Sequence, residues 1–271
     1  MALDPIITPQ QLPEQVALFD CRPETAAYLA GHIAGAIHAS LDRDLASHPE
    51  DAAQGGRHPL PRVQDLAALL GQWGLTPSTH VVAYDAQNGA NAAARFWWLL
   101  RAFGHARVQV VDGGLAALQA AGFPLSQEVP TVQPAPPYPA HRFVAPQADI
   151  DEVEAARLDP MRRVIDVRAS FRYRGESEPI DPVAGHIPGA INVPLSENLQ
   201  ADGRFKTAGE LHALYHDKLQ GVPAAQAIIH CGSGVTACHT LLALERAGLP
   251  GAKLYVGSWS EWCRNPQRER A

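Results

Sequence analysis

A chain of 271 residues is long enough for two domains, and 46% hydrophobic with 18% charged residues is typical of a folded globular protein rather than a disordered one. The net charge of -6 offers no basic surface for nucleic acid or for an anionic membrane. Four scattered cysteines exclude a disulfide scaffold and lack the close spacing of a zinc site. The beginning of the chain has no basic, apolar leader, and no apolar run approaches ~18 residues, so we expect a cytoplasmic protein without a membrane span.

The first half of the chain alternates short β-branched runs with helical patterns. A strand ending in Asp20-Cys21-Arg22 precedes the motif Gly31-His32-Ile33-Ala34-Gly35-Ala36-Ile37. Later strands end at Asp85 and at Asp112-Gly113-Gly114. Helical spacing is predicted over residues 61–73 and 92–103.

The second half repeats this order. Asp166-Val167-Arg168 and the motif Gly185-His186-Ile187-Pro188-Gly189-Ala190-Ile191 match the first pair, and the run from Ala227 to Cys231 lies where Val81 to Asp85 lies in the first copy. Helices are again predicted, over residues 210–219 and 237–247. Alternating strands and helices favour an α/β fold, so we predict two units of one ancestry, each a mainly parallel sheet with helices on both faces.

Prolines mark the boundary between the two copies. The stretch from Pro124 to Pro146 carries further prolines at 134, 136, 137 and 139, which exclude a helix or a central strand and favour an extended linker. The predicted organisation is therefore an N-terminal domain over 1–124, a linker over 125–145 and a C-terminal domain over 146–271.

The most informative segment of the second copy runs from Ala227 to Ala237. A buried strand delivers Cys231 into a loop of small residues that opens a helix. Ligands in such folds bind beyond the carboxyl ends of the strands, and amide groups at a helix N-terminus favour negative charge, which stabilises a thiolate. Cys231 is therefore the predicted nucleophile. The first copy carries Asp85 at this place, which cannot form a persulfide, so we expect its role to be structural.

These residues resemble the tandem-domain rhodanese family of sulfurtransferases over essentially the whole chain. The resemblance rests on the Gly-His-Ile-x-Gly-Ala motif of both copies, on the segment from Ala94 to His105 and on the segment from Tyr255 to Trp262. A first domain without the cysteine also fits the family. The resemblance implies two rhodanese-like domains and no metal or organic cofactor.

Within the family, the loop from Cys231 to Thr236 is similar to that of 3-mercaptopyruvate sulfurtransferases. Members that prefer thiosulfate carry two basic residues after the cysteine, where this chain has Gly232 and Ser233. The implied reaction forms a Cys231 persulfide and passes its outer sulfur to cyanide, to a small thiol or to thioredoxin. Ser233 would relay a proton, with His32 as its expected partner across a cleft, and the remaining loop residues would bind the substrate: Gly232, Gly234, Val235 and Thr236.

The family binds the donor carboxylate with an arginine that Arg172 matches. A guanidinium fork suits a carboxylate. Mercaptopyruvate enzymes usually have a second arginine about nine residues later, where this chain reads Pro179-Ile180-Asp181, so Arg174 is the candidate replacement.

Alternative interpretations concern the reaction and single residues. One alternative is a thiosulfate:cyanide sulfurtransferase, which differs only in its sulfur donor, and another is a non-catalytic module that binds or senses partners. A Cys-x5-Arg phosphatase is disfavoured, because Ala237 stands where such an enzyme needs arginine. Structural roles are expected for the Asp-x-Arg pairs, for a buried His230, for His186, and for the cysteines Cys21, Cys238 and Cys263.

Overall fold

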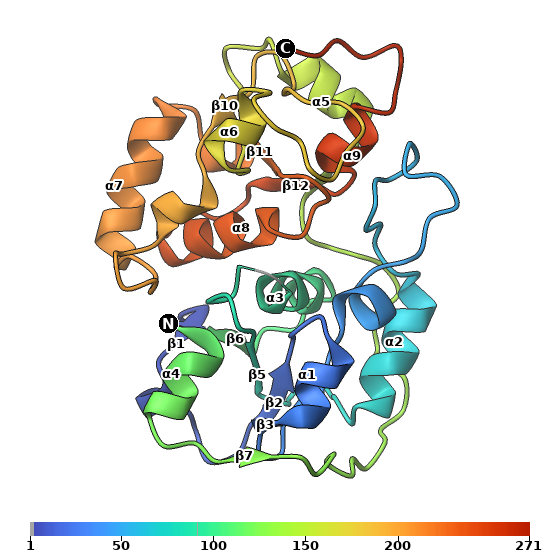
Figure 1. Cartoon of the computed structure of the whole chain (residues 1–271), viewed down its shortest axis with the longest axis vertical. Coiled ribbons are helices and arrows are strands. Elements are labelled where there is room, and N and C mark those ends of the chain that lie inside the picture. Colours follow the sequence, from blue (N-terminus) through green and yellow to red (C-terminus); the bar gives the residue numbers. More distant parts are fainter. Residues whose placement is uncertain (1–2, 91) are drawn as a thin grey trace. The chain divides into compact units, whose positions relative to one another are not determined.

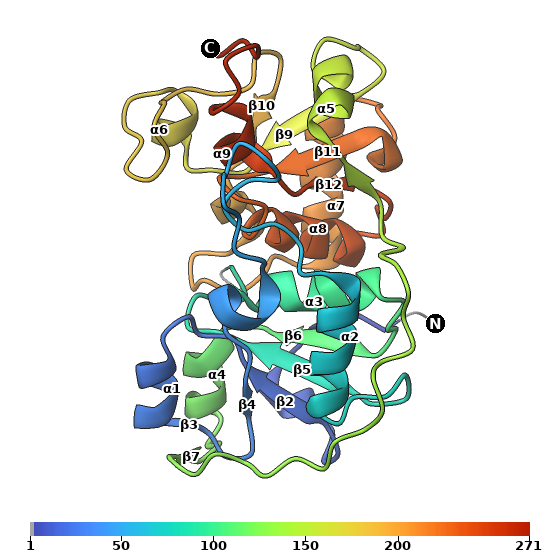
Figure 2. The same cartoon turned by 90° about the vertical axis from the view of Figure 1, so that its right-hand side faces the viewer.

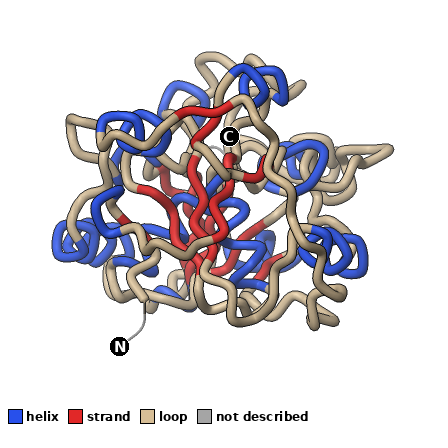
Figure 3. Tube along the Cα trace, turned by 90° about the horizontal axis from the view of Figure 1, so that it is seen from below, coloured by secondary structure: helices blue, strands red, loops and turns tan. Residues whose placement is uncertain are grey.

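The structure is a computed structural model that describes residues 3–90 and 92–271 (Figure 1). It divides into two compact units: the described residues up to Ser47 with Leu60–Ala145 form the first, and His48–Pro59 with Pro146–Ala271 form the second. Each unit contains a five-stranded parallel sheet flanked by helices, which confirms the predicted α/β class (Figure 3).

The first unit has the strand order β1-β6-β5-β2-β4, and all its neighbouring strands are parallel. A separate antiparallel pair joins β3 to β7. The strands are β1 (Ile6–Ile7), β2 (Ala17–Asp20), β3 (His32–Ile33), β4 (Ile37–His38), β5 (Val81–Tyr84), β6 (Val108–Val111) and β7 (Leu125–Ser126). The helices are α1 (Thr25–Ala30), α2 (Val63–Gln72), α3 (Ala93–Ala102) and α4 (Gly114–Ala120), with short helical turns at Pro9–Gln11 and Leu41–Leu45.

Alternation along β2 directs neighbouring side chains to opposite faces of this sheet. Phe19 contacts the ring of Trp73, directly after α2, and the ring of Phe96 in α3. Leu18 belongs to a separate apolar cluster that includes Leu118 of α4. The sheet is therefore covered on both faces, by α2 and α3 on one and by α4 on the other (Figure 2).

The second unit has the strand order β10-β9-β11-β12-β8, again parallel throughout. A capping box between Thr207 and Glu210 begins its longest helix. The strands are β8 (Gln147–Ala148), β9 (Arg163–Asp166), β10 (Ile191–Asn192), β11 (Ala227–His230) and β12 (Lys253–Tyr255). The helices are α5 (Ile150–Ala156), α6 (Ser170–Tyr173), α7 (Ala208–Leu219), α8 (Ala237–Arg246) and α9 (Ser258–Trp262), with short turns at Leu195–Asn198 and Ala224–Gln226.

The two sheets have the same order when the strands are matched as the sequence repeat matches them. Asp20 pairs with Tyr84 in the first sheet, and Asp166 pairs with His230 in the second. Each strand before the candidate loop, β5 or β11, is therefore central and has parallel neighbours on both sides. The internal repeat predicted from sequence is thus a repeat of topology.

Two segments differ from the predicted domain boundaries. Residues 48–59, expected in the N-terminal domain, belong to the second unit, because their contacts lie there. Residues 125–145, expected as a linker, belong to the first unit: β7 pairs with β3, and the amides of Tyr138 and Val144 donate to the carbonyls of Ala67 and Ala102. The proline-rich part contains no helix.

Candidate functional site

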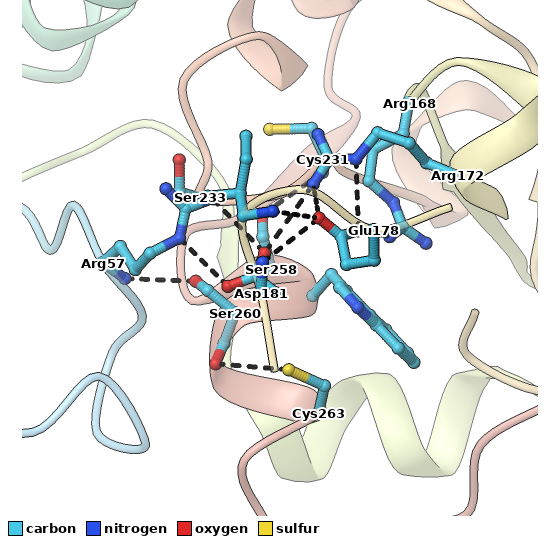
Figure 4. Close-up of polar contacts among 12 residues, drawn as sticks. Arg57, Arg168, Arg172, Glu178, Asp181, Cys231, Ser233, Ser258, Ser260 and Cys263 are labelled. Carbon is cyan, nitrogen blue, oxygen red and sulfur yellow. Dashed lines mark hydrogen bonds and ion pairs between the residues drawn. The ribbon is translucent and has the colours of Figure 1, made fainter. Parts of the chain in front are cut away.

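Cys231 follows β11 directly, at the carboxyl end of the central strand of the second sheet. Its side chain is buried, and its backbone is fixed by the start of α9. The Cys231 amide donates to Ser258 Oγ (3.2 Å), and the amides of Trp259 and Ser260 donate to the carbonyls of Cys231 (3.0 Å) and Gly232 (2.8 Å). The strand thus delivers the thiol, and α9 holds the loop that carries it (Figure 4).

The loop after Cys231 presents open backbone donors. Within the part of the chain that the structure describes, the amides of Gly232, Ser233, Val235 and Thr236 donate to no other residue. Gly234 has φ of 73°, and a Cβ there would lie 2.4 Å from the carbonyl oxygen of Val256, so only glycine fits. This loop can accept an anion next to the thiol.

The corresponding loop of the first unit already holds an anion. The Asp85 carboxylate accepts hydrogen bonds from the amides of Gln87 (2.8 Å), Gly89 (2.9 Å) and Ala93 (3.1 Å). In the first unit, the Asp85 carboxylate therefore occupies a group of backbone amides whose equivalent in the second unit is open beside Cys231. This arrangement supports the structural role expected for Asp85.

Ser233 lies two residues after Cys231 and is hydrogen-bonded to a histidine. Its Oγ is 2.7 Å from Nδ1 of His58, and the Ser233 side chain is buried. Such a pair can move a proton between a bound thiol and an imidazole. His58 belongs to neither repeated motif, so the sequence alone did not point to it. The available signal is length: the loop between Leu45 and Val63 exceeds the ~12–15 residues above which loops are usually functional.

Residues 48–59 reach this position by packing against the start of α9 (Figure 2). The Gly55 amide donates to Oε1 of Glu261 (2.8 Å), and the Arg57 amide donates to Oγ of Ser260 (3.1 Å). Between them Gly56 has φ of 80°, and a Cβ there would lie 2.3 Å from the carbonyl oxygen of Gly257. The segment is therefore placed by backbone contacts that leave no room for a side chain at residue 56.

His32, the partner expected for Ser233, belongs to the first unit. It is fully buried in the first unit, with its ring stacked on Tyr28 at a centroid distance of 3.9 Å. Nδ1 is 2.9 Å from the carbonyl oxygen of Tyr28, and Nε2 is 3.2 Å from that of Glu128. Because both ring nitrogens contact backbone carbonyls of its own unit, the structure gives His32 a packing role and corrects the catalytic one.

Arg172, which the sequence proposes as a ligand of the donor carboxylate, lies beside the Cys231 loop. A Cβ placed on Gly232 would lie 3.5 Å from its Nη2 and 3.6 Å from its Nη1. Nη2 and Nε donate to the Glu178 carboxylate at 2.6 and 3.1 Å. Burial by itself would raise the pKa of Glu178, but hydrogen bonds from Arg172 and from the amides of Asp181 and Ile180 outweigh it and lower that pKa. Glu178 thus stays ionised and fixes Arg172.

Arg174 does not join this site. Its guanidinium donates to the Glu176 carboxylate, with Nε at 2.5 Å from Oε1, and both side chains are exposed. In the part of the chain that the structure describes, these are its hydrogen bonds. The expected replacement for the second arginine is therefore corrected: Arg174 forms a surface ion pair.

The Asp-x-Arg pairs organise the two units in the same way, which agrees with the structural role expected for them. Nη2 of Arg168 donates to Asp166 and to the carbonyl of Gly185 (2.7 Å), and Nη2 of Arg22 donates to Asp20 and to the carbonyl of Gly31 (2.7 Å). Each arginine thus ties the carboxyl end of a strand to the glycine of the Gly-His-Ile motif.

His230, Cys21, Cys238 and Cys263 are buried, and the half-buried His186 stacks on the ring of Tyr173. Burial lowers the pKa of His230, whose ring lies 3.9 Å from Asp166, although that carboxylate acts in the opposite direction. Burial raises the pKa of the thiols of Cys21 and Cys263, and Cys238 Sγ donates to the carbonyl of Gly234. These groups are packed as the sequence predicted.

Across residues 3–90 and 92–271, His, Cys, Asp and Glu side chains form no group of three or more that could hold a metal ion. No described helix is both long and apolar enough to cross a bilayer.

Comparisons with known proteins agree with this architecture. The rhodanese-like domain matches residues 8–121 and 149–265. The chain is 43% identical to a probable 3-mercaptopyruvate sulfurtransferase of Pseudomonas aeruginosa, covering 97% of this chain and 96% of that protein. It is 41% identical to a putative thiosulfate sulfurtransferase of Mycobacterium tuberculosis (90% and 84% covered) and 39% identical to the human 3-mercaptopyruvate sulfurtransferase (85% and 76%).

Solved structures give the same result. SseA from Escherichia coli, described with the "rhodanese" fold of 3-mercaptopyruvate sulfotransferases, superposes with a TM-score of 0.76 at 30% identity, covering 96% of this chain and all of that one. A 3-mercaptopyruvate sulfurtransferase from Leishmania major gives a TM-score of 0.79 at 29% identity, covering 95% and 73%.

Proposed function

The chain belongs to the rhodanese family of sulfurtransferases, and from this premise we propose that it transfers sulfur from 3-mercaptopyruvate through a Cys231 persulfide. The observation that carries the proposal is the arrangement around Cys231: open loop amides, the Ser233–His58 pair, and Arg172 beside Gly232. These groups supply an anion site, a proton route and a carboxylate ligand next to one thiol.

In the first step, the Cys231 thiolate attacks the sulfur of 3-mercaptopyruvate. A sulfur–sulfur bond forms as the bond between sulfur and C3 breaks, and the electron pair of that bond leaves as the enolate of pyruvate. The proton of the donor thiol passes through Ser233 to His58 and from there to C3 of the enolate. The products are pyruvate and the Cys231 persulfide anion, which the loop amides stabilise.

In the second step, an acceptor removes the outer sulfur. A thiol attacks it and becomes a persulfide, and Cys231 leaves as the thiolate that began the cycle; with cyanide the product is thiocyanate. The acceptors we propose are cyanide in an assay, a small thiol, or thioredoxin. The few, scattered cysteines suit a reducing compartment, and we place the reaction in the cytoplasm.

The choice of donor follows from charge. Gly232 and Ser233 put no cation directly after the cysteine, whereas the sulfonate of thiosulfate would bring two negative charges to that place. Mercaptopyruvate keeps its single carboxylate farther from the reacting sulfur, within reach of Arg172. A neutral loop with a lateral guanidinium therefore supports a monoanionic donor.

The test compares kcat/KM for 3-mercaptopyruvate and for thiosulfate in the purified protein, with cyanide as acceptor. We expect a clear preference for mercaptopyruvate. A preference for thiosulfate would favour the alternative donor, which the Mycobacterium tuberculosis relative carries in its name. Intact mass after donor treatment should show one added sulfur atom in the native chain and none in Cys231→Ser. If the protein turns over neither donor, the result would favour the non-catalytic binding or sensing module.

A further inference from the structure

A second arginine lies beside the loop glycine, and it comes from residues 48–59. A Cβ placed on Gly232 would lie 3.2 Å from Nη2 of Arg57, closer than it would lie to either terminal nitrogen of Arg172. Two guanidinium groups from distant parts of the sequence thus flank the residue that follows Cys231. We infer that Arg57 is a substrate-binding residue that, with Arg172, holds the carboxylate of the sulfur donor. This inference rests on the proposed function.

Asp181 explains how Arg57 is held there. The Asp181 side chain is fully buried and accepts from Nε of Arg57 (3.0 Å), from Nη2 of Arg57 (3.3 Å) and from Nη1 of Arg264 (2.8 Å). Residue 181 is the place where the sequence was expected to carry a second arginine. Asp181 has no positive charge of its own to offer the ligand, but its carboxylate binds the guanidinium of Arg57. Asp181 is therefore a positioning residue.

Arg57 keeps donors for a ligand while it is bound to Asp181. An arginine has five N–H donors. Within the part of the chain that the structure describes, the Arg57 guanidinium donates to Asp181 alone, through Nε and Nη2, and Arg172 donates to Glu178 through Nε and Nη2. The Nη1 group of each therefore makes no hydrogen bond to a described residue. Because neither Nη1 group donates to a described protein acceptor, a carboxylate between the two arginines can accept hydrogen bonds from both.

The charges around this place suit one negative charge on the ligand. The groups joined by ion pairs are four guanidinium groups and three carboxylates, which leaves one positive charge: Arg57, Arg168, Arg172 and Arg264 against Asp166, Glu178 and Asp181. With the Cys231 thiolate balanced by the loop amides, a single carboxylate neutralises this excess, whereas the dianion thiosulfate would leave one charge uncompensated in a largely buried site. The cluster therefore contributes to donor choice.

The test uses two donors that differ in the carboxylate. 3-Mercaptopyruvate carries it, and mercaptoacetone has a methyl group in its place. Because a hydrogen bond to a charged group contributes about 1.5–3 kcal/mol, Arg57→Met should raise KM for mercaptopyruvate about 10- to 100-fold with little change in kcat. The same variant should leave the kinetics with mercaptoacetone nearly unchanged, and Arg57→Lys should recover part of the affinity.

Arg264→Met is the matched control. It removes another guanidinium that contacts Asp181 without removing one of the atoms nearest to Gly232, so KM for mercaptopyruvate should change less than in Arg57→Met. Asp181→Asn should raise KM for mercaptopyruvate, and not for mercaptoacetone, because Arg57 loses its anchor. Binding of pyruvate, measured by calorimetry, should weaken in parallel in Arg57→Met.

The outcomes separate this inference from the proposed function. If the native protein does not turn over mercaptopyruvate, the proposed function fails. If it does, and Arg57→Met has the native KM, the inference about Arg57 is wrong. If Arg57→Met loses kcat equally with both donors, the residue only holds residues 48–59 in place, and a ligand role is refuted.

Discussion

Nδ1 of His58 lies 2.7 Å from Oγ of Ser233, although 175 residues separate them in the chain. Neither residue could move the substrate proton by itself: a serine hydroxyl is too weak a base to keep the proton, and the histidine needs a group that connects it to the substrate. Because Ser233 lies two residues after Cys231 and contacts His58, we expect the two residues to act together as the general acid–base pair of the site.

If the pair acts as one relay, its two members should not contribute independently. Ser233→Ala and His58→Gln should each lower kcat/KM for the donor about 10²- to 10⁴-fold, the usual range for general acid–base groups. The double variant should be little worse than either single variant, because each loss already interrupts the route. A double variant whose loss equals the product of the two single losses would show that the residues act separately. Steady-state kinetics of the three variants decides.

The two loop glycines should respond differently to an added methyl group. In Gly234→Ala the Cβ meets a backbone carbonyl at a positive φ, so we expect a distorted loop, a lower melting temperature and loss of turnover. In Gly232→Ala the three atoms nearest to the added Cβ are terminal nitrogens of Arg57 and Arg172, at 3.2 to 3.6 Å, and these side chains can move. This variant should keep the native melting temperature while its KM for the donor rises. Equal melting temperatures for both variants would contradict the expected clash at residue 234.

Arg168→Leu should destabilise the second unit strongly. It leaves the fully buried Asp166 carboxylate without its guanidinium, and removing one partner of a buried ion pair costs about 3–5 kcal/mol of unfolding free energy. The double variant Asp166→Leu with Arg168→Leu should recover part of the loss. Arg62→Leu, which breaks an exposed pair with Asp65, is the control and should change little. Urea titrations measure all three, and a native midpoint in Arg168→Leu would refute the structural role.

His230 should make the protein less stable in mild acid. Burial lowers its pKa in the folded state, while in the unfolded chain it titrates near the ordinary value of about 6.5. As the pH falls below about 6.5, the unfolded chain binds a proton that the folded protein does not, so the unfolding free energy falls, by about 1.4 kcal/mol per pH unit at most. His230→Gln should lose less stability than the native protein between pH 7.5 and 5.5. The exposed His216→Gln serves as control, and identical pH slopes for the native protein and His230→Gln would disprove the prediction.

Local patterns in the sequence predicted four of the helices, the repeat and the position of Cys231. Helices predicted over 61–73, 92–103, 210–219 and 237–247 correspond to α2, α3, α7 and α8, because apolar periodicity reports which face of each helix is buried. The repeat predicted two matching sheets, and the strand orders agree. The position of Cys231 between a central strand and a helix follows from the same patterns.

What the sequence did not determine is which distant side chains meet at Cys231. His58 and Arg57 lie on a loop without periodicity, and their place depends on backbone contacts of Gly55 and Gly56 with α9, about two hundred residues away. His32 was expected at the site, but its ring stacks on Tyr28 just as its repeat equivalent His186 stacks on Tyr173. In the sequence, Asp181 stands where a second arginine was expected, and only the fold shows that its carboxylate binds the Arg57 guanidinium. Strand and helix patterns are set by neighbours in the chain, whereas a site is assembled by long-range packing, and that is visible only in the tertiary structure.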